Sequence, residues 1–287
     1  MRSSKQNAKS MKSRRALARA GVLGGLLLGT LFAGLPFVWM IASSLKRNPD
    51  VFAHPPTIWT ETSSLASYWS ILSDPTKVRF FLNSYVVAFA VVALTLILAI
   101  HAAYAFSRYE FPGKSVLNIV IVSVQAVPPV TLLVPYFGLI VALGLYNSYR
   151  GLIFTYVVLT LSYAIIMLTG YFNTLPAELD DAGKVDGASS FMVLWRLLVP
   201  IATPGIVSVG MYTFMIAWNE YLFALTLTRT NDMRTLPIGI QMLMGQHTFD
   251  WSEMLALSVL GAIPVVVVFL FFQRYFVGGM SAGAVKD

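Results

Sequence analysis

Six long apolar runs dominate this sequence of 287 residues and leave it few ways to fold. A helix needs about 20 apolar residues to cross the roughly 30 Å hydrocarbon layer of a bilayer. Hydrophobic residues make up 57% of the chain and charged residues only 11%, with a mean hydropathy of +0.71, which is far more apolar than a soluble domain. We therefore predict an all-α, polytopic membrane protein with six transmembrane helices near residues 21–45, 82–107, 115–143, 150–171, 204–228 and 254–276.

The basic residues indicate how these helices are oriented. Cytoplasmic loops carry an excess of Lys and Arg, and seven of the twenty basic residues lie in the first nineteen positions. With the N-terminus inside, thirteen basic residues are cytoplasmic and seven are outside, so we predict an N-in, C-in protein. Its parts are a basic cytoplasmic segment at 1–19, a membrane domain at 20–277 with a cytoplasmic loop at 172–203, and a cytoplasmic tail at 278–287.

The N-terminal region and the composition argue against several other classes of protein and site. A net charge of +7 would suit nucleic-acid binding in a soluble protein, but a basic cluster directly before an apolar run is a topology signal. The uncharged stretch from Ala20 to Leu45 is too long for the core of a cleavable signal peptide, so we expect it to stay as a membrane anchor. The absence of cysteine excludes disulfides and thiolate metal sites.

Prolines interrupt the third apolar run. Pro128, Pro129 and Pro135 follow Gln125 within a stretch that is longer than one crossing needs. Proline removes a backbone hydrogen bond and clashes with the preceding turn, so this helix is expected to bend or open. The freed backbone groups fit a cavity lining or a packed bundle interior equally well.

The loop at 172–203 is the most organised polar segment of the chain. Pro176 suits the first turn of a helix, and the carboxylates of Glu178, Asp180 and Asp181 suit its positive dipole end. We expect a short helix there, followed by a turn at Gly187 and a second amphipathic helix over 189–199. Ala182 and Gly183 would let a partner protein approach, while Asp181 and Asp186 would pair with its basic residues. The alternative is a solvated helix face.

A polar cluster in the fifth apolar run is the candidate solute contact. The cluster is Tyr212, Trp218, Asn219, Glu220 and Tyr221. A carboxylate at membrane depth is a functional hypothesis by default, and aromatic, amide and carboxylate groups together suit a sugar. The alternative is that Glu220 extends to the outer interface beside its aromatic neighbours.

Energy-coupling and catalytic motifs are missing from the sequence. The segment before Lys114 has Arg108 where a phosphate-binding loop needs its first glycine, so we expect no nucleotide site of that kind. His54, His101 and His247 are scattered, which predicts no metal site within one motif, and His101 is expected to be a packed, hydrogen-bonded residue. Few charges lie at membrane depth, so an ion-driven pathway is not indicated either.

The loop resembles the EAA loop of the permease subunits of bacterial binding-protein-dependent ABC importers. The resemblance rests on the run from Leu179 to Ala188, and on the proline at position 200. Asp181, Ala182 and Gly183 fall where the family has Glu-Ala-Ala, so the chain departs from the pattern at its first and third positions. Three further segments resemble the carbohydrate subgroup, specifically its maltose-type second permease: 103–114, Trp218-Asn219-Glu220, and 273–286.

The resemblance implies a type I ABC importer permease in the bacterial inner membrane that is not itself an enzyme. It implies a second homologous permease subunit, two cytoplasmic ATPase subunits that bind ATP and Mg²⁺, an extracytoplasmic solute-binding protein and a sugar substrate, with no nucleic acid. The residues that it assigns to ATPase coupling are Glu178, Asp181, Ala182, Gly183, Asp186 and Gly187. Uptake of a polyol or a glycerol phosphate by the same machinery stays open, as does a secondary transporter or channel without an ATPase.

Overall fold

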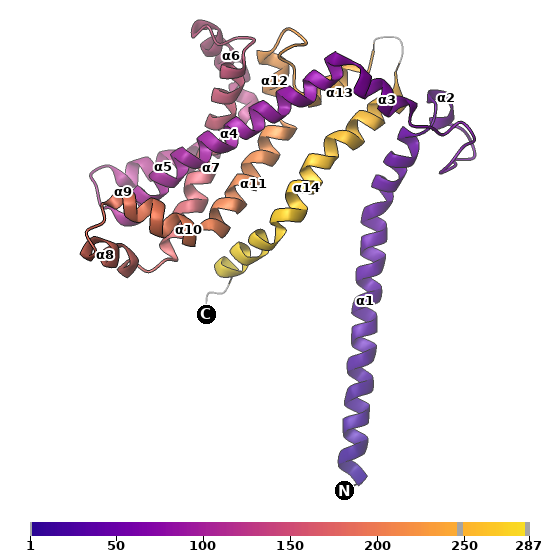
Figure 1. Ribbon diagram of the computed structural model, residues 1–287. Helices are drawn as coiled ribbons and strands as arrows, with labels where there is room; N and C mark the ends of the chain where they lie inside the picture. The colour runs from indigo at the N-terminus through magenta and orange to yellow at the C-terminus, as the bar shows by residue number, and fades with distance from the viewer. Residues whose placement is uncertain (1, 246–248, 285–287) are drawn as a thin grey trace. The chain divides into compact units, whose positions relative to one another are not determined.

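The computed structural model describes residues 2–245 and 249–284, and the side chains of 19–245 and 249–275. Within these ranges the chain is helical and has no β-strand, which confirms the all-α prediction (Figure 1). The chain divides into two compact units, one of Met1–Ser70 with Gly245–Val259 and one of Ile71–Met244 with Leu260–Asp287.

The first unit holds α1 (Arg2–Ser44), α2 (Asn48–Val51), most of α3 (Ala66–Ser73) and the first turns of α14 (Trp251–Ala284). From residue 19 onward, the large apolar side chains of α1 are mostly exposed, as expected of a helix that is surrounded by lipid. Polar bonds connect the rest of this unit. Asn48 bonds to the side chain of Asp250 and to the backbone of Ser252, and Ser70 Oγ donates to Glu253 Oε1 at 2.7 Å.

The second unit is built around α4 (Pro75–Arg108), which packs along α7 (Tyr149–Asn173) and α11 (Thr203–Asn219). A buried hydrogen bond of 3.0 Å joins the hydroxyls of Thr95 on α4 and Thr160 on α7. The other elements of this unit are α5 (Lys114–Val124), η1 (Pro129–Leu132), α6 (Leu133–Ala142), α8 (Glu178–Val185), α9 (Ser190–Met192), η2 (Val193–Leu198), α10 (Val199–Ile201), α12 (Leu222–Leu227), α13 (Leu236–Met242) and the rest of α14.

The described residues contain four helices that are long and apolar enough to cross a membrane, or up to six spans if two bent pairs are counted. The single helices are Arg19–Ser44, Pro75–Arg108, Tyr149–Asn173 and Trp251–Tyr275. The pair 114–124 and 129–142 is bent by 96°, which confirms the predicted interruption of the third run. The pair 190–201 and 203–219 is bent by 81°. The six-span count and the N-in, C-in orientation stay predictions.

The fifth run differs from its prediction. A continuous helix over 204–228 is wrong, because α11 ends at Asn219 and α12 begins at Leu222. The predicted boundaries of the membrane domain, after residues 19 and 277, fall inside α1 and α14. They stay predictions. His247, the end of the tail and the basic side chains before Arg19 lie outside the described residues and side chains.

Candidate coupling loop and membrane polar cluster

The predicted acidic helix of the loop is present as α8. Glu178, Asp180 and Asp181 lie in its first turn, where the partial positive charge of the helix N-terminus favours carboxylates. The helix ends before Asp186, and Gly187 follows with a φ of +79°, a left-handed backbone conformation that glycine adopts without steric cost. The turn therefore leads into the second half of the loop, as the sequence predicted.

The second half of the loop is helical, but it is not the regular α-helix that we predicted over 189–199. Its six central residues, Val193–Leu198, are π-helical. Single π-helical turns are rare and occur often at functional sites. Val193, Leu194 and Leu198 are buried in one apolar core that includes Ala103 of α4 and Phe172 of α7. The inner side of this half is thus packed onto the membrane helices.

A buried ion pair holds α8 against the end of α4. Arg108 Nε donates to Asp180 Oδ2 at 2.9 Å, and the hydroxyl of Tyr104 donates to Asp180 Oδ1 at 2.9 Å. The side chains of Arg108 and Asp180 are only 11% and 5% exposed. Arg108 Nη2 also donates to the carbonyl of Leu175, at 3.0 Å. We call Tyr104, Arg108 and Asp180 the α4 latch.

The sequence analysis missed the latch. It treated Asp180 only as one of three charges at a helix dipole, whereas the structure buries it and leaves Asp181 exposed. The available signal was Arg108, because an arginine that ends an apolar helix and is buried needs a carboxylate partner. Neighbouring acidic residues in a loop cannot be told apart by sequence alone, since which one points inward depends on the helix register.

Gly183 makes room within the loop. A Cβ at Gly183 would lie 2.8 Å from Val193 Cγ2, which is closer than atoms in proteins approach one another. Its small size therefore accommodates Val193 of the same loop, and the approach of a partner surface there stays a prediction. Ala182 is exposed, so a partner protein could approach it as predicted. A coupling role for either residue stays a prediction.

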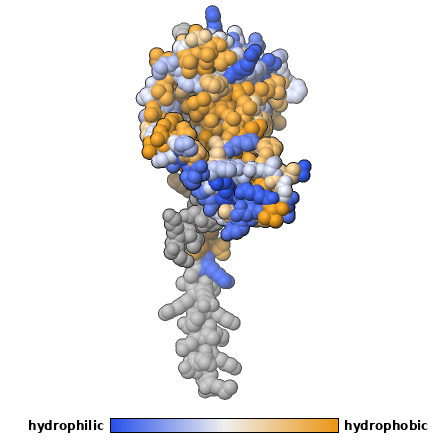
Figure 2. Space-filling model, turned by 90° about the vertical axis from the view of Figure 1, so that its left-hand side faces the viewer, coloured by the Kyte–Doolittle hydropathy of each residue, from blue (hydrophilic) through white to orange (hydrophobic). Residues whose placement is uncertain are grey.

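The remaining residues that were predicted to couple to the ATPase lie on the outward side of the loop. Val185 and Phe191 add apolar surface there and are 87% and 66% exposed. Acidic groups around exposed apolar side chains are typical of a protein docking surface. Figure 2 shows hydrophilic residues gathered at both ends of a largely apolar face. We call the following exposed residues the outer loop face: Glu178, Asp181, Ala182, Val185, Asp186, Gly187 and Phe191.

A second polar contact joins the loop to α4. Trp195 Nε1 donates to His101 Nε2 at 3.3 Å, and His101 Nδ1 is 2.7 Å from the carbonyl of Ile97. Because Nε2 accepts a hydrogen bond, the neutral imidazole carries its proton on Nδ1, which can donate to that carbonyl. The prediction that His101 is hydrogen-bonded is confirmed, but the prediction that it is packed is wrong, because the residue is exposed.

Glu220 stands at the break between α11 and α12. Its two carboxylate oxygens accept the backbone N–H groups of Phe223 at 2.8 Å and Ala224 at 2.9 Å. These are N–H groups that the start of a helix leaves unsatisfied. The structure thus gives Glu220 a capping role, and its contact with a solute stays a prediction.

The other members of the predicted cluster have different surroundings, and their place in a substrate path stays a prediction. Trp218 is buried, and its Nε1 donates to the carbonyl of Gly261 at 3.1 Å. Tyr212 stacks on Tyr163 with ring centroids 3.8 Å apart. Asn219 is exposed, but its Nδ2 donates to the carbonyl of Met215 at 2.8 Å. Tyr221 is half-buried. Stacking of Trp218 on a solute would require this packing to open.

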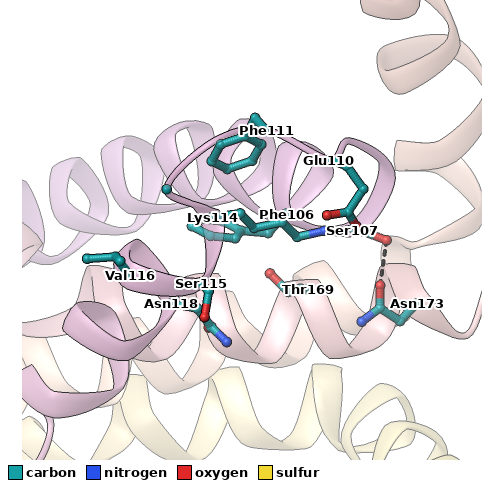
Figure 3. A pocket seen from close by; sticks show the side chains of 11 residues that line it. Phe106, Ser107, Glu110, Phe111, Lys114, Ser115, Val116, Asn118, Thr169 and Asn173 are labelled. Carbon is teal, nitrogen blue, oxygen red and sulfur yellow. Dashed lines mark hydrogen bonds and ion pairs between the residues drawn. The ribbon is translucent and has the colours of Figure 1, made fainter.

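A pocket of about 680 Å³ opens where the end of α4 meets α5 and α7. Phe106 and Ser107 line it from α4, Lys114 and Asn118 from α5, and Asn173 from α7 (Figure 3). Ser107 Oγ donates to Asn173 Oδ1 at 2.7 Å along one edge. The pocket contains no member of the predicted substrate path, so sequence analysis and cavity geometry point to different places.

Comparisons with known proteins agree on one family. Residues 95–281 match the family described as binding-protein-dependent transport system inner membrane component. This range contains the whole loop and the polar cluster.

Curated relatives match over almost the full chain. The sulfoquinovosyl glycerol transport system permease protein of Agrobacterium fabrum is 36% identical, over 91% of this chain and 90% of its own. The trehalose/maltose transport system permease protein of Thermococcus litoralis is 36% identical, over 94% of this chain and 98% of its own. Among solved structures, a chain of a bacterial ABC transporter that imports alginate has a TM-score of 0.77 at 22% identity, covering 89% and 96% of the two chains. The likeness to this last structure is one of fold.

Proposed function

Because the chain belongs to the family of binding-protein-dependent transport system inner membrane components, we propose that it is a permease subunit of an ATP-driven sugar importer. Members of this family are transport permeases and not enzymes. The names of the two relatives favour a sugar or sugar derivative as the solute. The observation that carries the proposal is the two-sided loop, whose outer face is exposed and whose inner side is latched to α4.

The proposal includes partners that this chain needs. A second homologous permease subunit would supply the other half of the pathway, and each of the two loops would dock on one of two cytoplasmic ATPase subunits. ATP and Mg²⁺ would bind in those subunits, while an extracytoplasmic binding protein would deliver the sugar. Nucleotide would then bias a two-state assembly between inward-facing and outward-facing forms, with the loop as the part that moves with the ATPase.

Reconstitution of the complete transporter in proteoliposomes tests this function. We expect uptake of radiolabelled maltose or trehalose to require ATP inside the vesicles and the binding protein outside, and to survive ionophores. Uptake that follows an ion gradient and ignores ATP would identify a secondary transporter or channel. Competition by glycerol phosphate or a polyol, but by no sugar, would select the alternative solutes.

Ala182→Arg tests the docking surface separately. Ala182 is exposed, so the new side chain blocks a partner without disturbing the loop, whereas any side chain at Gly183 would also displace Val193. We expect the variant to stay in the membrane and to lose about tenfold or more of the co-purifying ATPase. Ala53→Arg, at an exposed alanine in the first unit, is the matched control. Equal ATPase recovery from both variants would contradict docking at the outer loop face.

A further inference from the structure

We infer that three residues on one face of α4, His101, Tyr104 and Arg108, transmit movement of the loop into the membrane helices. The inference rests on the proposed function and adds to it the part of the membrane domain that receives the force. At about 100° per residue, positions i, i+3 and i+7 lie within about 60° of one another around a helix. We call these residues the α4 stripe.

Both halves of the loop bond to this stripe. The first half is fixed through Asp180, which Tyr104 and Arg108 contact at 2.9 Å each. The second half is fixed through Trp195, which donates to His101 at 3.3 Å. Because the two contacts lie on the same face of one helix, α8 and the π-helical segment would move together with the end of α4.

The polar contacts of the loop are concentrated on α4. Among the described residues, every side-chain hydrogen bond between 176–198 and a membrane helix ends on the stripe. The contacts with α7 in the same region are apolar and come from the shared core. Apolar contacts have no preferred direction, whereas a buried, hydrogen-bonded ion pair fixes both distance and direction. The stripe is therefore the directional connection between loop and membrane domain.

The opposite face of α4 has room for movement. Phe106 projects roughly 140° around the helix from His101, at about 100° per residue. Ser107 lies beside the stripe, about 60° from Tyr104, and accepts from Arg108 Nη1 at 3.2 Å. Phe106 and Ser107 both line the pocket of about 680 Å³ between α4, α5 and α7 (Figure 3). The end of α4 is thus bonded on the loop side and loosely packed on the other, so a push from the loop can displace it toward the pocket.

A displacement of α4 would reach the centre of the second unit. This helix packs along both α7 and α11, and its hydroxyl contact at Thr95 and Thr160 lies about two turns from the stripe. The stripe residues do not belong to the outer loop face. We therefore assign them as positioning residues, which act through Asp180 and Trp195 and not by touching the ATPase.

Arg108→Gln in the complete, reconstituted transporter tests this role, with sugar transported per ATP hydrolysed as the readout. We expect the ATPase subunits to co-purify and to hydrolyse ATP within about twofold of wild type, while transport per ATP falls about tenfold or more. The exchange of Arg108→Asp with Asp180→Arg should restore at least about half of the ratio. Arg150→Gln is the charge-matched control, because Arg150 is exposed and lies at the end of α7 away from the loop.

Tyr104→Phe is a second variant that removes one hydrogen bond and keeps the ring in place. It should lower transport per ATP about twofold to threefold at unchanged assembly. A normal ratio in both Arg108→Gln and Tyr104→Phe would overturn the inference, and so would loss of ATPase binding that the charge exchange fails to restore. A wild-type transporter without ATP-driven uptake would instead refute the proposed function, and the inference with it.

Discussion

The coupling loop and the polar cluster at the end of α11 each contain at least one carboxylate and a tryptophan but use their polar groups in opposite ways. The loop divides them: Asp180 is buried against α4, while Asp181 is exposed. The cluster turns its groups inward, with Trp218 bonded to Gly261 and Glu220 capping α12. A polar group with satisfied internal bonds supports the architecture, and an exposed one is available to a partner. The loop therefore has the stronger claim to a direct functional contact.

The largest expected effect separates the two neighbouring aspartates of the loop. Asp180→Ala leaves the Arg108 guanidinium buried without its carboxylate, which should lower the free energy of unfolding by about 3–5 kcal/mol. Asp181→Ala removes an exposed ion pair with Lys184 of 3.3 Å and should change that free energy by about 0–1 kcal/mol. Thermal unfolding of the purified subunit, with hydrogen exchange of α8, measures both.

The two aspartates should also differ in an assay of assembly with the ATPase, where Asp181 matters more for binding than for folding. Asp181→Ala should weaken co-purification of the ATPase more than it weakens folding, because its carboxylate is exposed. Asp180→Asn is the control that keeps the shape of the side chain and removes its charge. If Asp180→Ala and Asp181→Ala lower the free energy of unfolding equally, the α4 latch does not stabilise the loop more than the exposed ion pair does.

Gly183→Ala tests whether the small residue of the loop serves internal packing. Its Cβ would lie 2.8 Å from Val193 Cγ2, so we expect a loss of about 1–3 kcal/mol in the free energy of unfolding. Val193→Ala in the same chain removes the clashing atoms and should recover part of that loss. If Gly183→Ala is as stable as wild type and instead lowers ATPase binding, Gly183 faces the partner as the sequence suggested.

The sequence predicted the class of fold, the bend in the third run and the two-part loop, because these depend on apolar length, proline and helix capping. It could not predict the latch, since Arg108 and Asp180 are 72 residues apart and only packing brings them together. It also missed the break at Glu220. There the carboxylate replaces the backbone bonds that a continuous helix would have made, and no proline or glycine marks the site.

Glu220→Ala tests the cluster side of the comparison. Loss of both capping bonds to Phe223 and Ala224 should lower the free energy of unfolding by about 0.5–2 kcal/mol, and Glu220→Gln should cost less because one acceptor oxygen remains. Thermal unfolding beside uptake kinetics in proteoliposomes separates stability from solute binding. If Glu220→Gln keeps wild-type stability but raises the KM for sugar uptake, the carboxylate contacts the solute and the two regions are more alike than the structure suggests.

The smallest expected difference between the two regions is that between their tryptophans. Trp195→Phe keeps an aromatic ring beside His101 and removes one hydrogen bond, which should cost about 0.5–1.5 kcal/mol. Trp218→Phe removes an equivalent bond but leaves the Gly261 carbonyl without it in a buried position, so its cost should lie at about 1–3 kcal/mol. Thermal unfolding of the two variants side by side measures the difference. Since Trp195 belongs to the coupling loop, only its variant should also lower transport per ATP, whereas a fall in that ratio for Trp218→Phe at full stability would give the cluster a direct part in transport.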